Sequence, residues 1–370
     1  MSHEDIYPGH CTKGHPEVFN IEAMPEQPTV TKPGHVSRAE IERYFKQGYL
    51  VVEDFFLPEE LDPCLSAIEG VVDKVASALF RGGKIKDVHA DLNVFQRLTE
   101  LDKDFPGALI LTHKDGVLPP AFADLWANPR LLNFMEQILG PCVYANPIWN
   151  VRPKGPSVVC PDGDIPWHQD AGYFDPASYA TMIPVVWVPL LDTTTDNGCL
   201  QIVEGGHKNG MVCDHLNCFA NTWHIMMDES KVEKTLGVNL EKNVKTLPIK
   251  KGSFIVFNNL VPHRSLPNKT NQIRWSLDLR YQKPGLPEGL YGELPTIALR
   301  DPATPNLKVD WSPYTKIRHL HQHMMTCGKE APPPEMLDTT LTGPWMKQWP
   351  LVHGNRHTEA AGLVPLGQRA

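Results

Sequence analysis

A histidine and an aspartate stand one residue apart in the segment WHQDAGYF, residues 167–174. Alternate residues of a strand point to the same side, so His168 and Asp170 at a strand end would direct an imidazole and a carboxylate at one point. An isolated H-x-D pair is more often a solvated turn or a helix cap. Because two protein ligands do not complete a catalytic metal site, the metal interpretation requires a third ligand from elsewhere in the chain.

His263, in the segment VPHRSLPNKT, is the candidate for that third ligand. Non-haem Fe(II) oxygenases bind iron through two histidines and one carboxylate on a single face of the octahedron, which leaves three positions open. The set His168, Asp170 and His263 has the composition of such a facial triad. We therefore expect a distal strand to bring His263 next to the H-x-D pair.

The segment QIRWSLDLRYQ, residues 272–282, alternates between two kinds of side chain. In a strand, the even-numbered residues would share a polar face and the odd-numbered residues an apolar face. The polar set is Arg274, Ser276, Asp278 and Arg280, and the apolar set is Ile273, Trp275, Leu277, Leu279 and Tyr281. A dicarboxylate cosubstrate bound to the metal at one end would explain the polar face, since its far carboxylate favours a bidentate guanidinium such as that of Arg274.

The elements that must position these residues fall into two regions. Residues 1–36 show no sustained period and are expected to form an extended arm. Helices are expected up to about residue 140. A capping box at Ser37 would begin a helix that ends at Gly48, a stripe of apolar residues over 58–80 predicts an amphipathic helix, and Asn128 followed by Pro129 predicts a helix near 129–139.

From residue 143 to residue 282 the chain consists of short β-rich runs separated by turn residues. This spacing predicts an antiparallel sandwich or barrel rather than alternating strands and helices. Residues 284–370 contain many of the chain's 35 prolines and are expected to form a largely irregular extension on the surface.

Composition narrows the class of partner. The chain has 370 residues, a net charge of −8 and an isoelectric point near 6.0, which argues against nucleic-acid binding and favours a small-molecule substrate. No apolar run approaches the length of a membrane span, and the first residues lack the pattern of a secretion signal. The eight cysteines include no C-x-x-C pair. We expect a soluble protein with reduced thiols in the cytoplasm.

The arrangement of His168, Asp170, His263 and Arg274 resembles that of the phytanoyl-CoA dioxygenase family of Fe(II)/2-oxoglutarate oxygenases. Three further segments are similar to that family: YFKQGYLVVEDFFLPEEL to its opening helix and strand, WVPLLDTTTDNGCLQIVEGGHKNG to its central hairpin, and KGSFIVFNNLVPHRS to the strand before the distal histidine. The resemblance covers residues 38–283. It implies a mainly β fold, a double-stranded β-helix or jelly roll with flanking helices, over a domain of residues 37–283 between the arm 1–36 and the extension 284–370.

The same resemblance implies the ligands and the reaction. Fe(II) would be bound by His168, Asp170 and His263, and 2-oxoglutarate by Arg274, with Ser265 and Trp187 lining its pocket. With O2, and ascorbate as a candidate reductant, the enzyme would hydroxylate a small molecule and release succinate and CO2. Asp170 favours hydroxylation over halogenation, because related halogenases replace this carboxylate with a small residue.

Two alternatives stay open at this stage. The same oxidant could desaturate, cyclise or epoxidise a natural-product substrate, or the jelly roll could bind a ligand or metal without turnover. The substrate and the oligomeric state are not indicated by the sequence. Of the other histidines, His207 is expected to be structural, and His319, His321 and His323 to begin a helix rather than form a second metal site.

Overall fold

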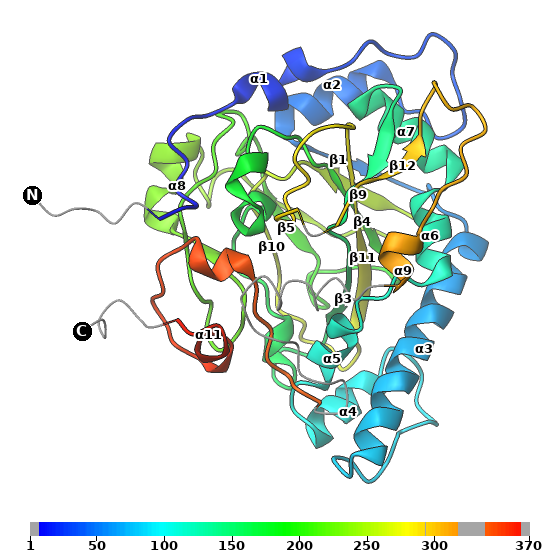
Figure 1. Cartoon of the computed structure of the whole chain (residues 1–370), viewed down its shortest axis with the longest axis vertical. Coiled ribbons are helices and arrows are strands. Elements are labelled where there is room, and N and C mark those ends of the chain that lie inside the picture. The colour runs from blue at the N-terminus through cyan, green and yellow to red at the C-terminus, as the bar shows by residue number, and fades with distance from the viewer. Residues whose placement is uncertain (1–6, 293, 317–336, 364–370) are drawn as a thin grey trace, which may run out of the picture.

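The computed structural model describes residues 7–292, 294–316 and 337–363. A seven-stranded antiparallel sheet lies at its centre (Figure 1), with strand order β1-β9-β4-β11-β2-β12, and β3 pairs with the first half of β11. Its strands are β1 (Tyr49–Val52), β2 (Val143–Ala145), β3 (Asn150–Lys154), β4 (Val185–Pro189), β9 (Phe254–Phe257), β11 (Arg274–Gln282) and β12 (Ile297–Arg300). The long strand β11 therefore contacts three others and is the axis of the sheet.

A second, three-stranded sheet has the order β10-β5-β8, and a short β6-β7 pair stands apart from both sheets. These strands are β5 (Leu200–Val203), β6 (His215–Leu216), β7 (Met226–Met227), β8 (Val244–Leu247) and β10 (His263–Ser265). Apolar residues of both sheets, among them Trp187, Ile202 and Phe257, form one buried cluster. The two sheets therefore face each other across a shared apolar layer.

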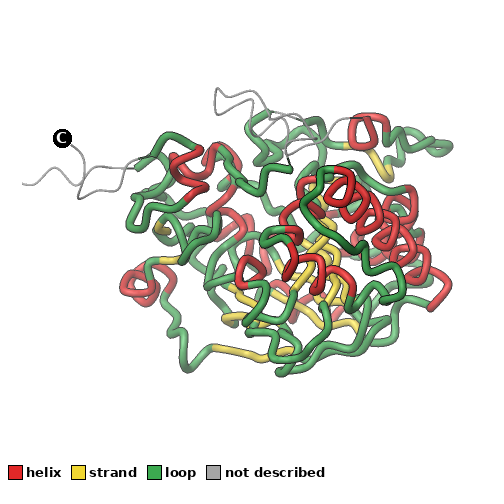
Figure 2. Tube along the Cα trace, turned by 90° about the horizontal axis from the view of Figure 1, so that it is seen from below, coloured by secondary structure: helices red, strands yellow, loops and turns green. Residues whose placement is uncertain are grey.

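Helices cover the other face of the large sheet, and Figure 2 shows the strands in the interior with helices outside them. The helices are α1 (Pro16–Phe19), α2 (Arg38–Gln47), α3 (Pro58–Arg81), α4 (Arg97–Asp104), α5 (Ala108–Lys114), α6 (Pro120–Trp126), α7 (Pro129–Leu139), α8 (Glu229–Leu236), α9 (Ser312–Lys316) and α11 (Arg356–Ala360). None of the helices in the described ranges is long and apolar enough to cross a membrane.

The local signals of the first region are confirmed. Ser37 caps α2 with a complete capping box, and Gly48 ends it at a φ of 93°, a left-handed conformation that glycine adopts without strain. The helix expected over 58–80 is α3, and its apolar stripe is buried. Asn128 caps α7 through its side chain and Gly140 follows its last residue.

The alternation in β11 is also confirmed. All five odd-numbered residues from Ile273 to Tyr281 lie in the core against the helices, and none is measurably exposed. The even-numbered residues are buried as well, on the opposite side of the strand, toward the small sheet. Buried polar side chains need polar partners. The polar face of this nine-residue buried strand must therefore border a polar interior.

One expectation about connectivity needs correction. The segment WVPLLDTTTDNGCLQIVEGGHKNG is not a hairpin, because β4 pairs in the large sheet and β5 in the small one. The chain therefore crosses between sheets at residues 190–199. The extension beyond residue 283, expected to be largely irregular, also contributes one strand, since β12 joins the large sheet beside β2. A four-residue strand is too short for its alternation to stand out in the sequence.

Candidate functional site

The three predicted ligands meet at one point. Asp170 Oδ1 lies 3.6 Å from Nε2 of His168 and 3.7 Å from Nε2 of His263. One ligand atom of each residue lies within 4.8 Å of the other two, and all three residues are buried. Within residues 7–292, 294–316 and 337–363, this is the one group of three or more histidine, cysteine or carboxylate side chains with such spacing.

Backbone pairing holds the two histidines together. His263 is the first residue of β10, and the amides and carbonyls of His168 and His263 exchange two hydrogen bonds of 3.0 and 2.9 Å. This isolated bridge places the imidazole rings 4.1 Å apart between centroids. Asp170 begins the 3-10 turn Asp170–Tyr173 directly after the bridge, so its carboxylate turns back toward the rings.

Each histidine is held in the tautomer that a metal requires. Nδ1–H of His168 donates to the Pro166 carbonyl at 2.9 Å, and Nδ1–H of His263 donates to the Val261 carbonyl at 3.0 Å. The Nε2 lone pairs therefore face Asp170. Burial, with the nearby His168 ring, lowers the pKa of His263 to about 3, so this imidazole is neutral near pH 7.

Arg280 fixes the carboxylate of Asp170. Nη2 and Nε of Arg280 donate to Asp170 Oδ2 at 2.6 and 3.1 Å, which leaves Oδ1 directed at the two histidines. Burial alone would raise the pKa of Asp170, but Arg280 and both histidines outweigh it and hold that pKa well below its usual value. The sequence placed Arg280 on the correct strand face, but its contact with Asp170 crosses between distant segments and was not predicted.

One side of the triad opens into a cavity, here called the arginine cavity. It is lined by Arg152, Ile165, His168, Asp170, Trp187, Leu200, Phe257, His263, Arg264, Ser265, Arg274, Asp278 and Arg280. The predicted residues Arg274, Ser265 and Trp187 therefore share this cavity with all three members of the triad.

Two buried polar atoms in the arginine cavity have no hydrogen-bond partner, Arg274 Nε and Ser265 Oγ. Arg274 Nη1 donates to Ser276 Oγ at 2.6 Å, and its guanidinium carbon lies 5.1 Å from the Trp187 ring. Burial lowers the pKa of Arg274 to about 10, so the side chain keeps its charge near pH 7. Because buried polar groups are normally paired, these two atoms indicate a missing polar ligand.

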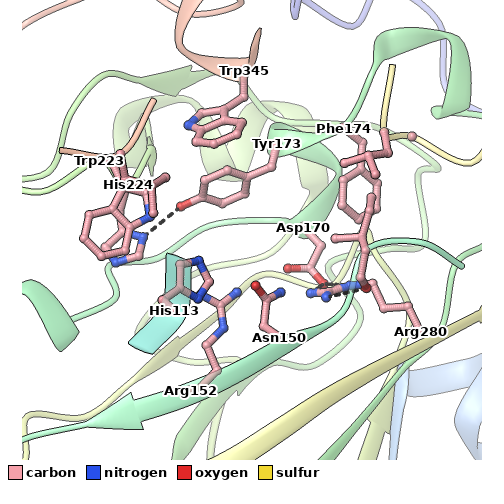
Figure 3. A pocket seen from close by; sticks show the side chains of 14 residues that line it. His113, Asn150, Arg152, Asp170, Tyr173, Phe174, Trp223, His224, Arg280 and Trp345 are labelled. Carbon is pink, nitrogen blue, oxygen red and sulfur yellow. Dashed lines mark hydrogen bonds and ion pairs between the residues drawn. The ribbon is translucent and has the colours of Figure 1, made fainter. Parts of the chain in front are cut away.

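The other side of Asp170 opens into a second cavity, here called the aromatic cavity. Figure 3 shows Trp345 and Tyr173 above it, Trp223 and His224 to one side, and Arg152 and Asn150 below. Its lining is His113, Ile148, Asn150, Arg152, Asp170, Tyr173, Phe174, Trp223, His224, Arg280, Gly289, Leu290, Leu341 and Trp345. Most of these residues were not predicted, because they come from separate segments that only the fold brings together.

Gln169, between the two ligands of the H-x-D pair, is a further residue that the sequence did not single out. It is fully buried, its Nε2 donates to the carbonyls of Met211 and Leu260 at 3.0 and 2.6 Å, and its Oε1 accepts from the Cys213 amide at 2.7 Å. Its own amide donates to Nε2 of His215 at 3.1 Å. The residue thus fastens the loop between His168 and Asp170 to two neighbouring segments.

The remaining histidines do not join the triad. His207 is fully buried and its Nε2–H donates to the Phe45 carbonyl at 3.0 Å, which fits the structural role expected for it. His319, His321 and His323 lie outside the described residues.

Two curated relatives match part of this chain. A relative from Streptomyces arenae, named 1-deoxypentalenic acid 11-beta-hydroxylase, is 28% identical over 169 residues, 44% of this chain and 56% of its own. The ectoine dioxygenase of Bordetella bronchiseptica is 26% identical over 181 residues, 48% of this chain and 52% of its own. The chain therefore spans little more than half the length of these curated relatives.

Among solved structures, the apo form of ThoJ, a non-heme monooxygenase, aligns with a TM-score of 0.49 and 20% identity over 70% of this chain and 83% of that one. The profile of the family described as phytanoyl-CoA dioxygenase matches residues 44–276, which is more than half of the sequence. The chain belongs to the phytanoyl-CoA dioxygenase family.

Proposed function

We propose that this chain is an Fe(II)- and 2-oxoglutarate-dependent dioxygenase that hydroxylates a C–H bond of a small molecule, with release of succinate and CO2. One observation carries the proposal: two imidazole Nε2 atoms and one carboxylate oxygen converge beside a cavity that contains a buried, incompletely paired arginine. Two histidines and a carboxylate are the ligand set of non-haem Fe(II) oxygenases.

The residues present fit the metal. His168 and His263 direct their Nε2 atoms at Asp170 because backbone carbonyls accept their Nδ1 protons. Asp170 offers Oδ1 because Arg280 occupies Oδ2. When bound, Fe(II) with 2-oxoglutarate and O2 would supply the oxidation of an unactivated C–H bond. The chain's part is to set the ligand directions and to keep bulk water from the site, since all three ligands are buried.

The residues of the arginine cavity fit 2-oxoglutarate. A dicarboxylate with one end at the triad would bring its far carboxylate to Arg274, where Nε lacks a partner, and to the unpaired hydroxyl of Ser265. Ser276 holds the guanidinium from the other side. The flat ring of Trp187 lies against Arg274 and limits its movement.

The architecture and the relatives support the same proposal. Two facing antiparallel sheets with the triad between them are the arrangement expected of a double-stranded β-helix, which we propose as the fold of residues 37–283 between the arm 1–36 and the extension 284–370. The names of the relatives describe oxidation of small molecules. The described cysteines are free thiols, so we also propose a reducing compartment such as the cytoplasm.

Succinate formation tests the proposal. We expect the purified chain, supplied with Fe(II), 2-oxoglutarate, ascorbate and O2, to form succinate slowly even without its substrate. Asp170→Ala should reduce this rate at least 100-fold, because it removes one of three ligands, while circular dichroism stays unchanged. Mass spectrometry of succinate measures both variants.

Two results would reject the activity. Wild type that binds 2-oxoglutarate but forms no succinate would be a binding protein rather than an enzyme. An Asp170→Ala rate equal to that of wild type would remove Asp170 from the metal site.

A further inference from the structure

The C-terminal segment lines part of the aromatic cavity. Leu341 and Trp345 line it beside Tyr173 and Trp223, although both lie about 170 residues after the H-x-D pair and outside the region that matches the family profile. Figure 3 shows the Trp345 indole directly above the Tyr173 ring. Their ring centroids are 6.0 Å apart at an angle of 63°, the edge-to-face contact that aromatic pairs favour.

Hydrogen bonds fasten this segment to the turn that carries Asp170. Trp349 Nε1 donates to the Gly172 carbonyl at 2.7 Å, and Gln348 Nε2 donates to the Phe174 carbonyl at 3.0 Å. On its other side, Asn217 Nδ2 donates to the carbonyls of Met346 and Trp349 at 2.6 and 3.1 Å. The segment is thus a fixed wall of the cavity rather than a loose covering.

Gly343 sets the direction of Trp345. A Cβ atom at position 343 would lie 1.7 Å from Cζ3 of the Trp345 ring, far inside van der Waals contact. The indole can therefore fold over the backbone of residue 343 only because no side chain stands there. A substitution at Gly343 would therefore displace the Trp345 indole without removing it.

Two arginines, Arg152 and Arg280, stand at the polar end of the cavity, each paired with an aspartate. Arg152 Nε donates to Asp278 at 2.9 Å, and its two η nitrogens have no hydrogen-bond partner among the described residues. Asp170, the one carboxylate among the described residues of the lining, is already paired with Arg280. A ligand here would meet the two η nitrogens of Arg152, a pair that favours a planar carboxylate.

The rest of the lining includes the polar side chains of His113, Asn150 and His224, and is otherwise apolar and mostly aromatic. Tyr173, Phe174, Trp223 and Trp345 supply rings, and Leu290 supplies an aliphatic surface. Flat, rigid walls on several sides suit a compact ring body rather than a long flexible chain, because rigid partners lose less conformational entropy on binding.

From these contacts we propose that the aromatic cavity binds a small carboxylic acid with a compact apolar ring body. The carboxylate pairs with Arg152, the ring body lies against the aromatic walls beside Asp170, and Trp345 determines which ring bodies fit. This inference rests on the proposed function, since it assigns the substrate class to the same site.

Isothermal titration calorimetry with two matched probes tests the proposal. We would titrate 1-adamantanecarboxylate and 1-adamantanamine, which share one ring body, into the metal-free full chain and into the chain loaded with Zn(II) and 2-oxoglutarate. The acid should bind at least tenfold more tightly than the amine. Arg152→Met should abolish this preference, and Trp345→Ala and Gly343→Ala should each weaken acid binding at least tenfold.

Two controls separate the wall from general damage to the fold. Trp345→Phe retains a ring and should keep acid affinity within about threefold of wild type. Trp311→Ala removes an indole that packs on Trp126, outside both cavities, and should leave acid affinity unchanged. Each variant is first checked for a native circular dichroism spectrum.

Several outcomes overturn the proposal: no acid binding to wild type, equal affinity for acid and amine, or wild-type affinity in Trp345→Ala. Loss of 2-oxoglutarate binding in Arg152→Met would assign that residue to the cosubstrate and also reject it. If wild type forms succinate but does not bind the acid, only the proposed substrate site is rejected. If wild type binds the acid but forms no succinate, only the proposed activity is rejected.

Discussion

At the scale of single residues, the pair of Asp170 and Arg280 determines the geometry of the triad. Both side chains are almost completely buried, and two N–H groups of Arg280 converge on one oxygen of Asp170. The other oxygen is thereby aimed at the two histidines. A buried carboxylate that loses its cation is strongly unfavourable, so this contact also matters for folding before any metal binds.

Arg280→Met should lower the free energy of unfolding of the metal-free chain by about 3–5 kcal/mol, because it leaves a buried carboxylate unpaired. Urea unfolding in the presence of a chelator measures this loss. The double variant Asp170→Asn/Arg280→Met should lose less than the sum of the two single changes, since it removes both charges. A loss below about 1 kcal/mol in Arg280→Met would show that the pair is not the constraint described here.

At the scale of elements, β11 carries two functions on its two faces. Trp275 lies in the core, where its indole N–H donates to the Val94 carbonyl at 2.9 Å. Its neighbour Ser276 faces the interior between the sheets and accepts from Arg274. One strand thus joins the helical layer to the proposed cosubstrate site, and adjacent substitutions should have different effects.

Trp275→Ala should destabilise the fold by about 3–5 kcal/mol, as expected for a large side chain removed from a packed core. Ser276→Ala should lower stability by only about 1 kcal/mol, the value of the hydrogen bond that Arg274 loses, and should weaken 2-oxoglutarate binding about fivefold. Thermal unfolding and 2-oxoglutarate titration separate the two effects. Equal effects of both changes on 2-oxoglutarate affinity would contradict the two-face description.

This strand also shows what the sequence could and could not predict. Period-two alternation over nine residues predicted both faces of β11, and capping residues predicted α2 and α7, because these signals are local. Distant segments of the chain are joined by the contact of Arg280 with Asp170, by the hydrogen bonds of Gln169 and by the contacts of Trp345. No local pattern encodes them, and the crossing from β4 to β5 was missed because a turn signal does not reveal which sheet the next strand enters.

At the scale of the whole molecule, buried neutral histidines make the fold sensitive to acid. Burial lowers the pKa of His207 and of His357 to about 4. His357 Nδ1 accepts from the Leu341 amide at 2.9 Å, so the C-terminal segment depends on its neutral form. In the unfolded chain these side chains gain a proton near pH 6.5, well before the folded chain does.

The free energy of unfolding should therefore be greatest above pH 6.5 and should fall as the pH decreases from about 6.5 to about 4. Each such histidine contributes a slope of up to about 1.4 kcal/mol per pH unit. His207→Gln has an amide that can still donate to the Phe45 carbonyl. This variant should reduce the slope by the contribution of one histidine, up to about 1.4 kcal/mol per pH unit. Urea unfolding at a series of pH values measures it, and an unchanged slope in the variant would contradict the assignment.

The most direct test of the whole account is an anaerobic titration of the Fe(II)-loaded chain with 2-oxoglutarate, followed by its visible metal-to-ligand charge-transfer absorption. The account predicts a saturable band in wild type, and a band in Arg274→Met that needs at least tenfold more 2-oxoglutarate, because the far carboxylate loses its guanidinium. Absence of the band in a folded, iron-loaded wild type would contradict the account, and so would equal affinity of the two proteins for 2-oxoglutarate.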